Sequence, residues 1–248
     1  MIYLTGDTHR DFERFFWFCK RQQTHRETDL MIILGDVGLN YYGNGLDKKA
    51  KQQLSSFPIT FLCIHGNHEM RPETIESYEQ MEWNGGRVYV ELEFPNILFA
   101  RDGDVYDLGG IHTMVIGGAY SVDKEERLEA MDFGFRDYKW FPDEQPSEET
   151  KRRCENVLQA HNHQLDAMLT HTCPMSVRPV HAFLPSVDQE TVDTSTEEWL
   201  QTIKDKTRIL RWYSGHYHVD EMIDNHKMLY RDIVVFPTKE ELYGSVPV

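Results

Sequence analysis

The chain of 248 residues has only four cysteines, no apolar run long enough to cross a membrane, and a shortage of basic residues. The cysteines are scattered without a Cys-x-x-Cys spacing, which argues against a zinc ribbon and a disulfide framework; they are Cys19, Cys63, Cys154 and Cys173. No apolar run approaches the roughly 20 residues of a membrane-spanning helix. An apolar run opens the sequence, with no signal-peptide pattern before it. We therefore expect a cytoplasmic protein without a membrane anchor.

The charge balance is acidic, with 26 Lys and Arg against 41 Asp and Glu and a net charge of -15. This balance disfavours a protein that holds extended nucleic acid on a broad basic surface. A local basic pocket for one phosphate is still compatible with it, and bound metal ions would reverse the local field. Hydrophobic residues make up 40% of the chain, enough for the core of a single α/β domain over residues 1–248.

The sequence contains five short polar motifs, and most of them follow a short apolar run. In order they are Gly6-Asp7-Thr8-His9, Gly35-Asp36, Gly66-Asn67-His68-Glu69, Thr170-His171 and Gly215-His216-Tyr217-His218. A polar residue directly after a strand lies at the carboxyl edge of the sheet, where open α/β sheets place their ligands. Carboxylate, imidazole and amide groups gathered at one edge suit two adjacent divalent transition metals.

The first third of the chain alternates strand and helix. Helical spacing predicts amphipathic helices over 11–23 and 47–56, between strands at 1–4, 30–34 and 59–64. Because such crossovers are right-handed, the three strands should be parallel neighbours with Asp7, Asp36 and Asn67 at one edge.

The rest of the chain has shorter elements. Short apolar runs within 87–118 predict antiparallel hairpins, with turns at Gly85-Gly86, Pro95-Asn96, Asp102-Gly103 and Gly109-Gly110. Ser147 and the acidic residues after it predict a helix from 147 to about 164, followed by a strand at 166–169. A further helix is expected around Trp199 and Ile203. The last predicted strands are 208–213, 218–223, 228–231 and 233–236, with a turn at Asp224-Asn225 between two of them.

In this order the motifs resemble the calcineurin-like metallophosphoesterase superfamily. That family has Asp-x-His, Gly-Asp, Gly-Asn-His-Asp/Glu, a single His, and Gly-His-x-His, and this chain supplies each part between Asp7 and His218. The resemblance implies a four-layer α/β/β/α sandwich, with two mixed sheets face to face and helices outside.

The resemblance also implies a set of metal ligands. One ion would be held by Asp7, His9, Asp36 and His218, and the other by Asp36, Asn67, His171 and His216. Asp36 would bridge the two ions and so belong to the catalytic residues. We expect divalent ions, Mn²⁺ first, with Fe, Zn, Ni or Co as alternatives. A metal-bridging hydroxide would then attack a phosphodiester or phosphomonoester, while His68 stabilises the transition state or protonates the leaving oxygen. Glu69 has either a supporting or a purely local role.

Each motif has a simpler alternative. An Asp after a glycine is also typical of turns and helix caps, and Gly66-Asn67 is a common turn. His216 and His218 could form an exposed pair on a strand. Other histidines compete with His171, namely His112, His161, His163 and His181, but His171 alone follows an apolar strand and precedes a turn.

The segment after Gly117-Gly118 is a candidate substrate loop. The glycines let the backbone approach the site, Tyr120 offers a stacking face, and Lys124 and Arg127 offer positive charge. The alternative is a loop that enters a solvent-exposed helix. Residues 133–140, with Arg136, Lys139 and Trp140, would form either a lid over the site or ordinary packing.

The second motif departs from that of the protein serine/threonine phosphatases, because Gly35-Asp36-Val37-Gly38-Leu39-Asn40 lacks their later Asp and Arg. We therefore expect a phosphorylated small molecule, a nucleotide or a nucleic-acid end as substrate. The alternative is a catalytically idle scaffold for protein interaction. The sequence leaves the oligomeric state open.

Overall fold

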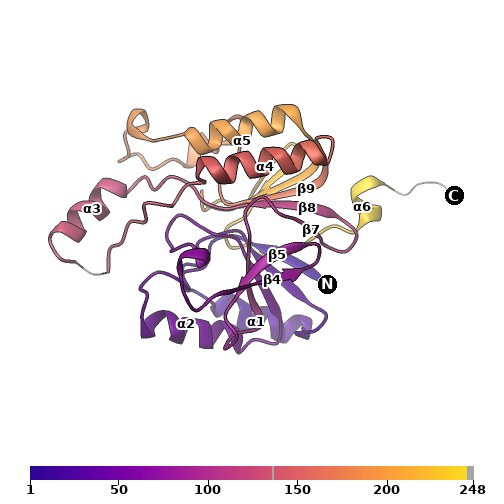
Figure 1. Ribbon diagram of the computed structural model, residues 1–248, viewed down its shortest axis with the longest axis horizontal. Helices are drawn as coiled ribbons and strands as arrows, with labels where there is room; N and C mark the ends of the chain where they lie inside the picture. The colour runs from indigo at the N-terminus through magenta and orange to yellow at the C-terminus, as the bar shows by residue number, and fades with distance from the viewer. Residues whose placement is uncertain (136, 245–248) are drawn as a thin grey trace.

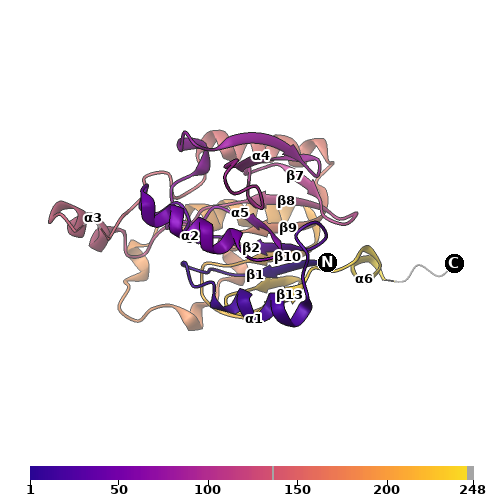
Figure 2. The ribbon, with the colours of Figure 1, turned by 90° about the horizontal axis from the view of Figure 1, so that it is seen from below.

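Two β-sheets lie face to face in the protein, and helices cover the outer face of each (Figures 1 and 2). The structure is a computed structural model that describes residues 1–135 and 137–244. Helices α1 (Glu13–Gln22) and α2 (Gly45–Ser55) cover one sheet, while α4 (Glu148–Ala160) and α5 (Ser195–Lys206) cover the other. The four layers are the α/β/β/α sandwich expected from the sequence.

The first sheet has seven strands within the described ranges, in the order β13-β1-β2-β3-β6-β5-β4. In that order they span Val234–Val235, Ile2–Thr5, Leu30–Ile33, Thr60–Cys63, Ile97–Ala100, Gly86–Val90 and Glu79–Trp83. The sheet is mixed: β1, β2, β3 and β6 run parallel, and the outer strands run antiparallel to their neighbours. The expected parallel order of the first three strands is confirmed.

The second sheet has six strands in the same described part of the chain, ordered β11-β12-β10-β9-β8-β7. They span Glu221–Ile223, His226–Met228, Arg208–Ser214, Gln164–Thr170, His112–Ile116 and Val105–Asp107. Strands β12, β10, β9 and β8 are parallel, and both edge strands are antiparallel. The second sheet is therefore mixed like the first.

The central strands are buried on both faces, which explains their unbroken apolar runs. Along β2, Ile32 packs in the core between the two sheets, whereas Met31 and Ile33 pack against the helices α1 and α2. In the second sheet Met168 packs beneath α4 and α5. Successive side chains thus fill different cores, and both sheets are fixed in place on either side.

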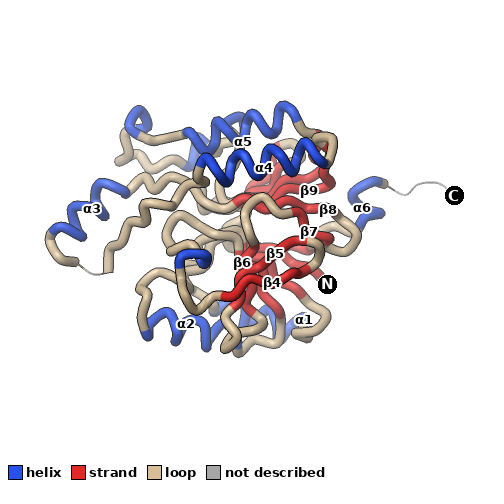
Figure 3. Tube along the Cα trace, in the orientation of Figure 1, coloured by secondary structure: helices blue, strands red, loops and turns tan. Residues whose placement is uncertain are grey.

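Loops gather on the side of the sandwich from which α3 (Lys124–Asp132) projects (Figure 3). A long connection between β9 and α5 contains the short 3₁₀ turns Met175–Val177, Val180–Ala182 and Gln189–Thr191. A further 3₁₀ turn, Pro72–Thr74, follows the third polar motif, and α6 (Lys239–Tyr243) lies near the carboxyl terminus. No helix within the described residues is long and apolar enough to cross a bilayer.

Some expected boundaries were wrong. The helix that Ser147 caps ends at Ala160 and not near 164, because Asn162 and His163 adopt left-handed backbone (φ 53° and 54°) that turns the chain into β9. The strand expected over 218–223 begins only at Glu221, and the strand expected over 228–231 lies earlier, at His226–Met228. The edge strands β4 and β7 were missed. β4 is mostly exposed and β7 has only three residues, so neither has an apolar run to mark it.

Candidate metal centre

The seven predicted metal ligands meet at the carboxyl edge of both sheets. They lie on the loops after β1, β2, β3, β9 and β10, and parallel strands bring such loops to one edge. Ligand atoms of Asp7, His9 and His218 all lie within 4.8 Å of one another, and so do those of Asp7, Asp36 and His171. Asn67 contacts both His171 and His216. The structure therefore brings all seven residues together.

Each aspartate uses one oxygen to fix its position and directs the other at the histidines. Asp7 Oδ1 accepts the backbone N–H of His216 at 2.9 Å, and its Oδ2 lies 3.2 Å from Nε2 of His218. Asp36 Oδ1 accepts the backbone N–H of His68 at 2.8 Å. Burial alone would raise the pKa of both carboxyls, but the facing histidines lower both pKa values below the usual range. Both side chains are thus available as anionic ligands.

Asp36 lies between the two groups of predicted ligands. Its Oδ2 lies 3.8 Å from Nε2 of His9 and 3.8 Å from Nε2 of His171. His9 belongs with Asp7 and His218, since its Nε2 lies 3.7 Å from Asp7 Oδ2 and 3.1 Å from His218 Nε2. One carboxylate oxygen thus stands between two separate sets of nitrogen and oxygen donors.

The second set converges on the amide oxygen of Asn67. His171 Nδ1 lies 2.8 Å from the carbonyl oxygen of Leu34, so Nδ1 carries the proton and Nε2 presents a lone pair. That Nε2 lies 2.8 Å from Asn67 Oδ1, which is itself an acceptor because Asn67 Nδ2 donates to Ser121 Oγ. His216 Nδ1 lies 3.1 Å from the same oxygen, and burial lowers the pKa of His216 to about 3, so its ring is neutral.

His171 Nε2 and Asn67 Oδ1 are thus both acceptors although they lie 2.8 Å apart, and a cation bound by both atoms would relieve their repulsion. The donor set is made of imidazole nitrogen, carboxylate and amide oxygen, without sulfur, and this combination suits divalent transition metals. The residues present therefore fit a pair of divalent ions that share Asp36.

Left-handed backbone is concentrated at the ligands, at His9 (φ 43°), Asp36 (φ 46°), His216 (φ 68°) and His218 (φ 53°). Non-glycine residues rarely adopt this conformation, and each instance costs roughly 1–3 kcal/mol. The fold bears this cost at four of the seven predicted ligands, which is typical of functional sites.

Gly35 illustrates how tightly the centre is built. It has a φ of 104°, and an added Cβ would lie 2.0 Å from Nδ1 of His171. The replacement Gly35→Ala should therefore displace His171 and break its contact with Leu34. Loss of such a supporting contact weakens metal binding by roughly 10–100-fold. Metal titration by calorimetry measures the effect.

Gly45→Ala is the matched control, because no atom lies within 4 Å of the Cβ position there. If Gly35→Ala bound metal like the control, His171 would not be a ligand.

Two supporting residues stand behind the ligands. Glu69 is fully buried, and its carboxylate accepts the backbone N–H groups of Gly66, Val37 and Gly38, which ties the second motif to the third. Burial, with the nearby charge of Asp36, raises the pKa of Glu69 to about 8. Glu69 thus has a supporting role that connects two ligand loops. Arg14, which the sequence did not single out, donates to the backbone carbonyl of Asp7.

A family model for calcineurin-like phosphoesterases matches residues 1–220, a range that contains all seven ligand positions. The chain belongs to the calcineurin-like phosphoesterase family. The resemblance inferred from the motifs is thereby confirmed. Family membership implies divalent metal ions and a phosphorylated substrate.

Other comparisons are more distant. Among curated proteins no sequence matches the chain significantly. Of the solved structures, the phosphopantetheinyl hydrolase from Mycobacterium tuberculosis is similar over 99% of this chain and 92% of its own, with 14% sequence identity and a TM-score of 0.46.

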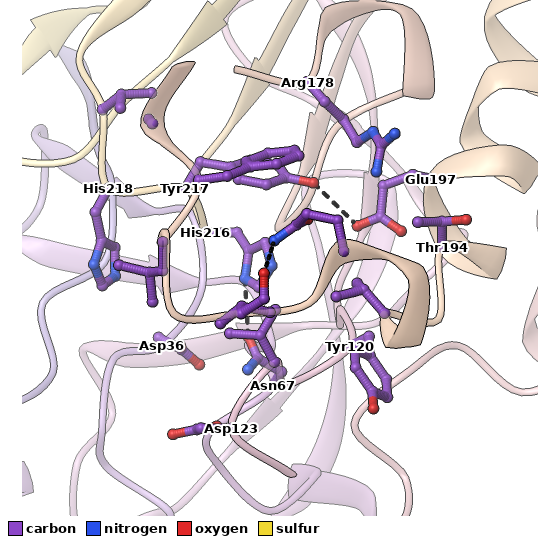
Figure 4. A pocket seen from close by; sticks show the side chains of 18 of the residues that line it. Asp36, Asn67, Tyr120, Asp123, Arg178, Thr194, Glu197, His216, Tyr217 and His218 are labelled. Atoms are coloured by element: carbon purple, nitrogen blue, oxygen red, sulfur yellow. Dashed lines mark hydrogen bonds between the residues drawn. The ribbon is translucent and has the colours of Figure 1, made fainter. Parts of the chain in front are cut away.

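A pocket of about 410 Å³ opens beside the candidate metal centre (Figure 4). Asp36, Asn67, His216 and His218 line one part of it. His68 lines it too, and Nδ1 of His68 is buried without a hydrogen-bond partner in the described part of the chain. His68 is thus placed where it can face a bound substrate.

The three predicted substrate residues are placed differently from one another. Tyr120 lines the pocket, whereas Lys124 and Arg127 do not. Lys124 Nζ lies 4.5 Å from the ring centroid of Trp140 and 5.8 Å from that of Tyr120. Arg127 donates to Asp123 at 2.7 Å and also holds Tyr41 and the carbonyl of Lys139. Substrate binding by these residues stays a prediction.

Other predicted and unpredicted residues surround the pocket. Of the 133–140 segment, Lys139 donates to the carbonyl of Tyr42 and Trp140 packs under Lys124, while Arg136 lies outside the described residues. Sequence reasoning missed Ser121, which orients Asn67, and the pocket wall between Arg178 and Glu197. These residues have no strand-end motif that could have marked them.

Proposed function

We propose that this chain is a two-metal phosphoesterase and that the seven residues are its metal ligands. The observation that carries the proposal is the position of Asp36 Oδ2, 3.8 Å from both His9 Nε2 and His171 Nε2. Two divalent ions bound here would lower the pKa of bound water toward about 7 and neutralise phosphoryl oxygens. Mn²⁺ is our first expectation, with Fe, Zn, Ni or Co as alternatives. A cytoplasmic location and one domain over residues 1–248 stay predictions from the sequence.

The chain's own residues have separate tasks in this proposal. Asp36 offsets the repulsion between the two sites, and Asn67 is fixed by Ser121 so that its oxygen faces the centre. His68 contacts the phosphoryl group or the leaving oxygen, either as a hydrogen-bond donor or as an acid. A positioned acid contributes roughly 10²–10⁴-fold in rate.

The pocket favours a small phosphoester. A volume of about 410 Å³ is near the lower end of the range for small-molecule sites, and the net charge of -15 disfavours a long polyanion. We propose a phosphodiester or phosphomonoester of a nucleotide, of a nucleic-acid end, or of another small molecule.

The test uses purified chain stripped of metal and reloaded with each candidate ion in turn. Hydrolysis of bis(4-nitrophenyl) phosphate and of 4-nitrophenyl phosphate should appear only with metal. The ratio of the two hydrolysis rates distinguishes a diesterase from a monoesterase. If no ion supported turnover of either ester, the phosphoesterase proposal would be rejected. The alternative of a catalytically idle scaffold for protein interaction would then remain.

Lys124→Ala tests the loop after Gly117-Gly118. If Lys124 and Tyr120 bind the substrate beyond its scissile phosphate, the replacement should raise KM for a charged nucleotide more than for a small aryl phosphate. The expected loss is that of one partly exposed charged hydrogen bond, about 1.5–3 kcal/mol at most. Steady-state kinetics with both substrates measure it.

Lys20→Ala is a fitting control, because Lys20 lies 5.8 Å from the ring centroid of Trp17 on α1 and is not a pocket residue. Metal content should stay constant in both variants. Equal responses of the two substrates would mean that Lys124 only begins helix α3.

A further inference from the structure

The pocket extends beyond the metal centre into a region that no metal ligand uses. Its far wall comes from the connection between β9 and α5, from the start of α5 and from the loop after β10 (Figure 4). Most of this wall is apolar or aromatic; its apolar members are Ala182, Phe183, Leu184, Val187 and Val192. The rings of Phe183 and Tyr217 stack with centroids 5.9 Å apart. A flat, largely apolar group therefore fits here better than a sugar or a polyol.

One buried carboxylate interrupts the apolar wall. Glu197 is 4% exposed, and its Oε1 accepts the hydroxyl of Thr172 at 2.6 Å and that of Tyr217 at 3.5 Å. Its Oε2 is buried and has no hydrogen-bond partner in the described part of the chain. A buried carboxylate oxygen without a donor is unfavourable unless a ligand supplies one.

A guanidinium lies near that carboxylate without pairing with it. Arg178 is 5.6 Å from the ring centroid of Phe183, and its Nε is buried and without a partner among the described residues. Residues 1–135 and 137–244 contain no ion pair of 4.0 Å or less between Arg178 and Glu197. A buried acceptor and a buried donor at the end of the pocket thus each lack a partner among the described residues.

We propose that this part of the pocket, formed by Arg178, Phe183, Glu197 and Tyr217, binds the nucleobase of a nucleotide ester. Glu197 Oε2 accepts a ring N–H of the base, Arg178 donates to a base carbonyl, and the apolar wall contacts the ring. Carboxylate and guanidinium groups read the donor and acceptor edges of bases in this way, and aromatic side chains contact their faces. Two other kinds of ligand group fit less well. A second anionic group would be repelled by Glu197, and a plain alkyl group would leave Glu197 and Arg178 without hydrogen-bond partners. The proposal rests on the phosphoesterase function proposed above.

The experiment compares three chromogenic esters on the metal-loaded chain. They are thymidine 5′-(4-nitrophenyl phosphate), its N3-methyl derivative, which lacks the ring N–H, and bis(4-nitrophenyl) phosphate, which has no base. The wild type should prefer the thymidine ester to the N3-methyl ester by roughly tenfold in kcat/KM, the worth of one charge-assisted hydrogen bond. In Glu197→Gln, which keeps an oxygen for Thr172, that preference should fall to about twofold or less.

Glu198→Gln is the matched control, because Glu198 is the next carboxylate on α5, accepts the hydroxyl of Thr194 at 3.0 Å and does not line the pocket. It should keep the wild-type preference among the three esters. The base-binding proposal would be overturned if the wild type showed no preference for the ester with the ring N–H, or if Glu197→Gln kept that preference. In either case, turnover of the base-free ester would still support the phosphoesterase function. No turnover of any ester by the wild type would reject both.

Discussion

Replacing Asp36 by asparagine is expected to abolish turnover and to lower metal occupancy. Asp36 Oδ2 lies between His9 and His171, and two dications about 3.5–4 Å apart repel each other strongly. A neutral amide offers an oxygen of similar size but no charge to offset that repulsion. The variant should therefore lose at least one of its two ions, and with it the activation of water that the ion would supply.

Metal analysis of the purified variant, together with its rate on an aryl phosphodiester, measures the effect. Asp166→Asn provides a comparison, because Asp166 is also a buried carboxylate but accepts hydrogen bonds from His112 and Tyr243 at another part of the fold. That variant should keep its metal. Full occupancy and a normal rate in Asp36→Asn would reject Asp36 as the bridge.

His68→Ala should keep both ions and lose rate. The side chain lines the pocket and is not needed to complete either ligand set, while its backbone N–H holds Asp36 in every variant. The rate should fall by roughly 10²–10⁴-fold, the usual contribution of a positioned acid. If His68 protonates the leaving oxygen, a good leaving group such as 4-nitrophenolate should reduce the loss.

A series of aryl phosphodiesters with leaving groups of rising pKa separates the two roles of His68. A loss that grows along the series indicates an acid, and a constant loss indicates charge stabilisation. His161→Ala, at the exposed end of α4, serves as the reference variant. Loss of metal in His68→Ala would contradict the assignment of His68 to the substrate.

The layered fold followed from local patterns. Apolar runs of four to six residues at 30–34 and 59–64 became β2 and β3, buried on both faces as unbroken runs require. Boundaries failed where the backbone becomes left-handed, as at His163 and His218, because an ordinary residue in that conformation leaves no mark in the sequence pattern.

The sequence by itself determined which residues gather at the metal centre. Asp7, Asp36 and Asn67 each directly follow a glycine within four residues of a strand end, and parallel strands bring those positions to one edge. Only the tertiary structure decided how those side chains are aimed. Ser121 orients Asn67 from 54 positions away, and the carbonyl of Leu34 orients His171 from 137 positions away.

The far wall of the pocket was likewise settled only by the tertiary structure. Glu197 lies on helix α5, and Arg178 lies in the irregular segment before it, so no strand-end pattern marks either of them. Such contacts depend on how α5 and the connection before it pack against the second sheet. Residues that are distant in the chain become neighbours only after the apolar faces are buried and the elements are fixed in place. Periodicity in the sequence predicts which face of an element is buried, but it does not predict which residues that face will contact.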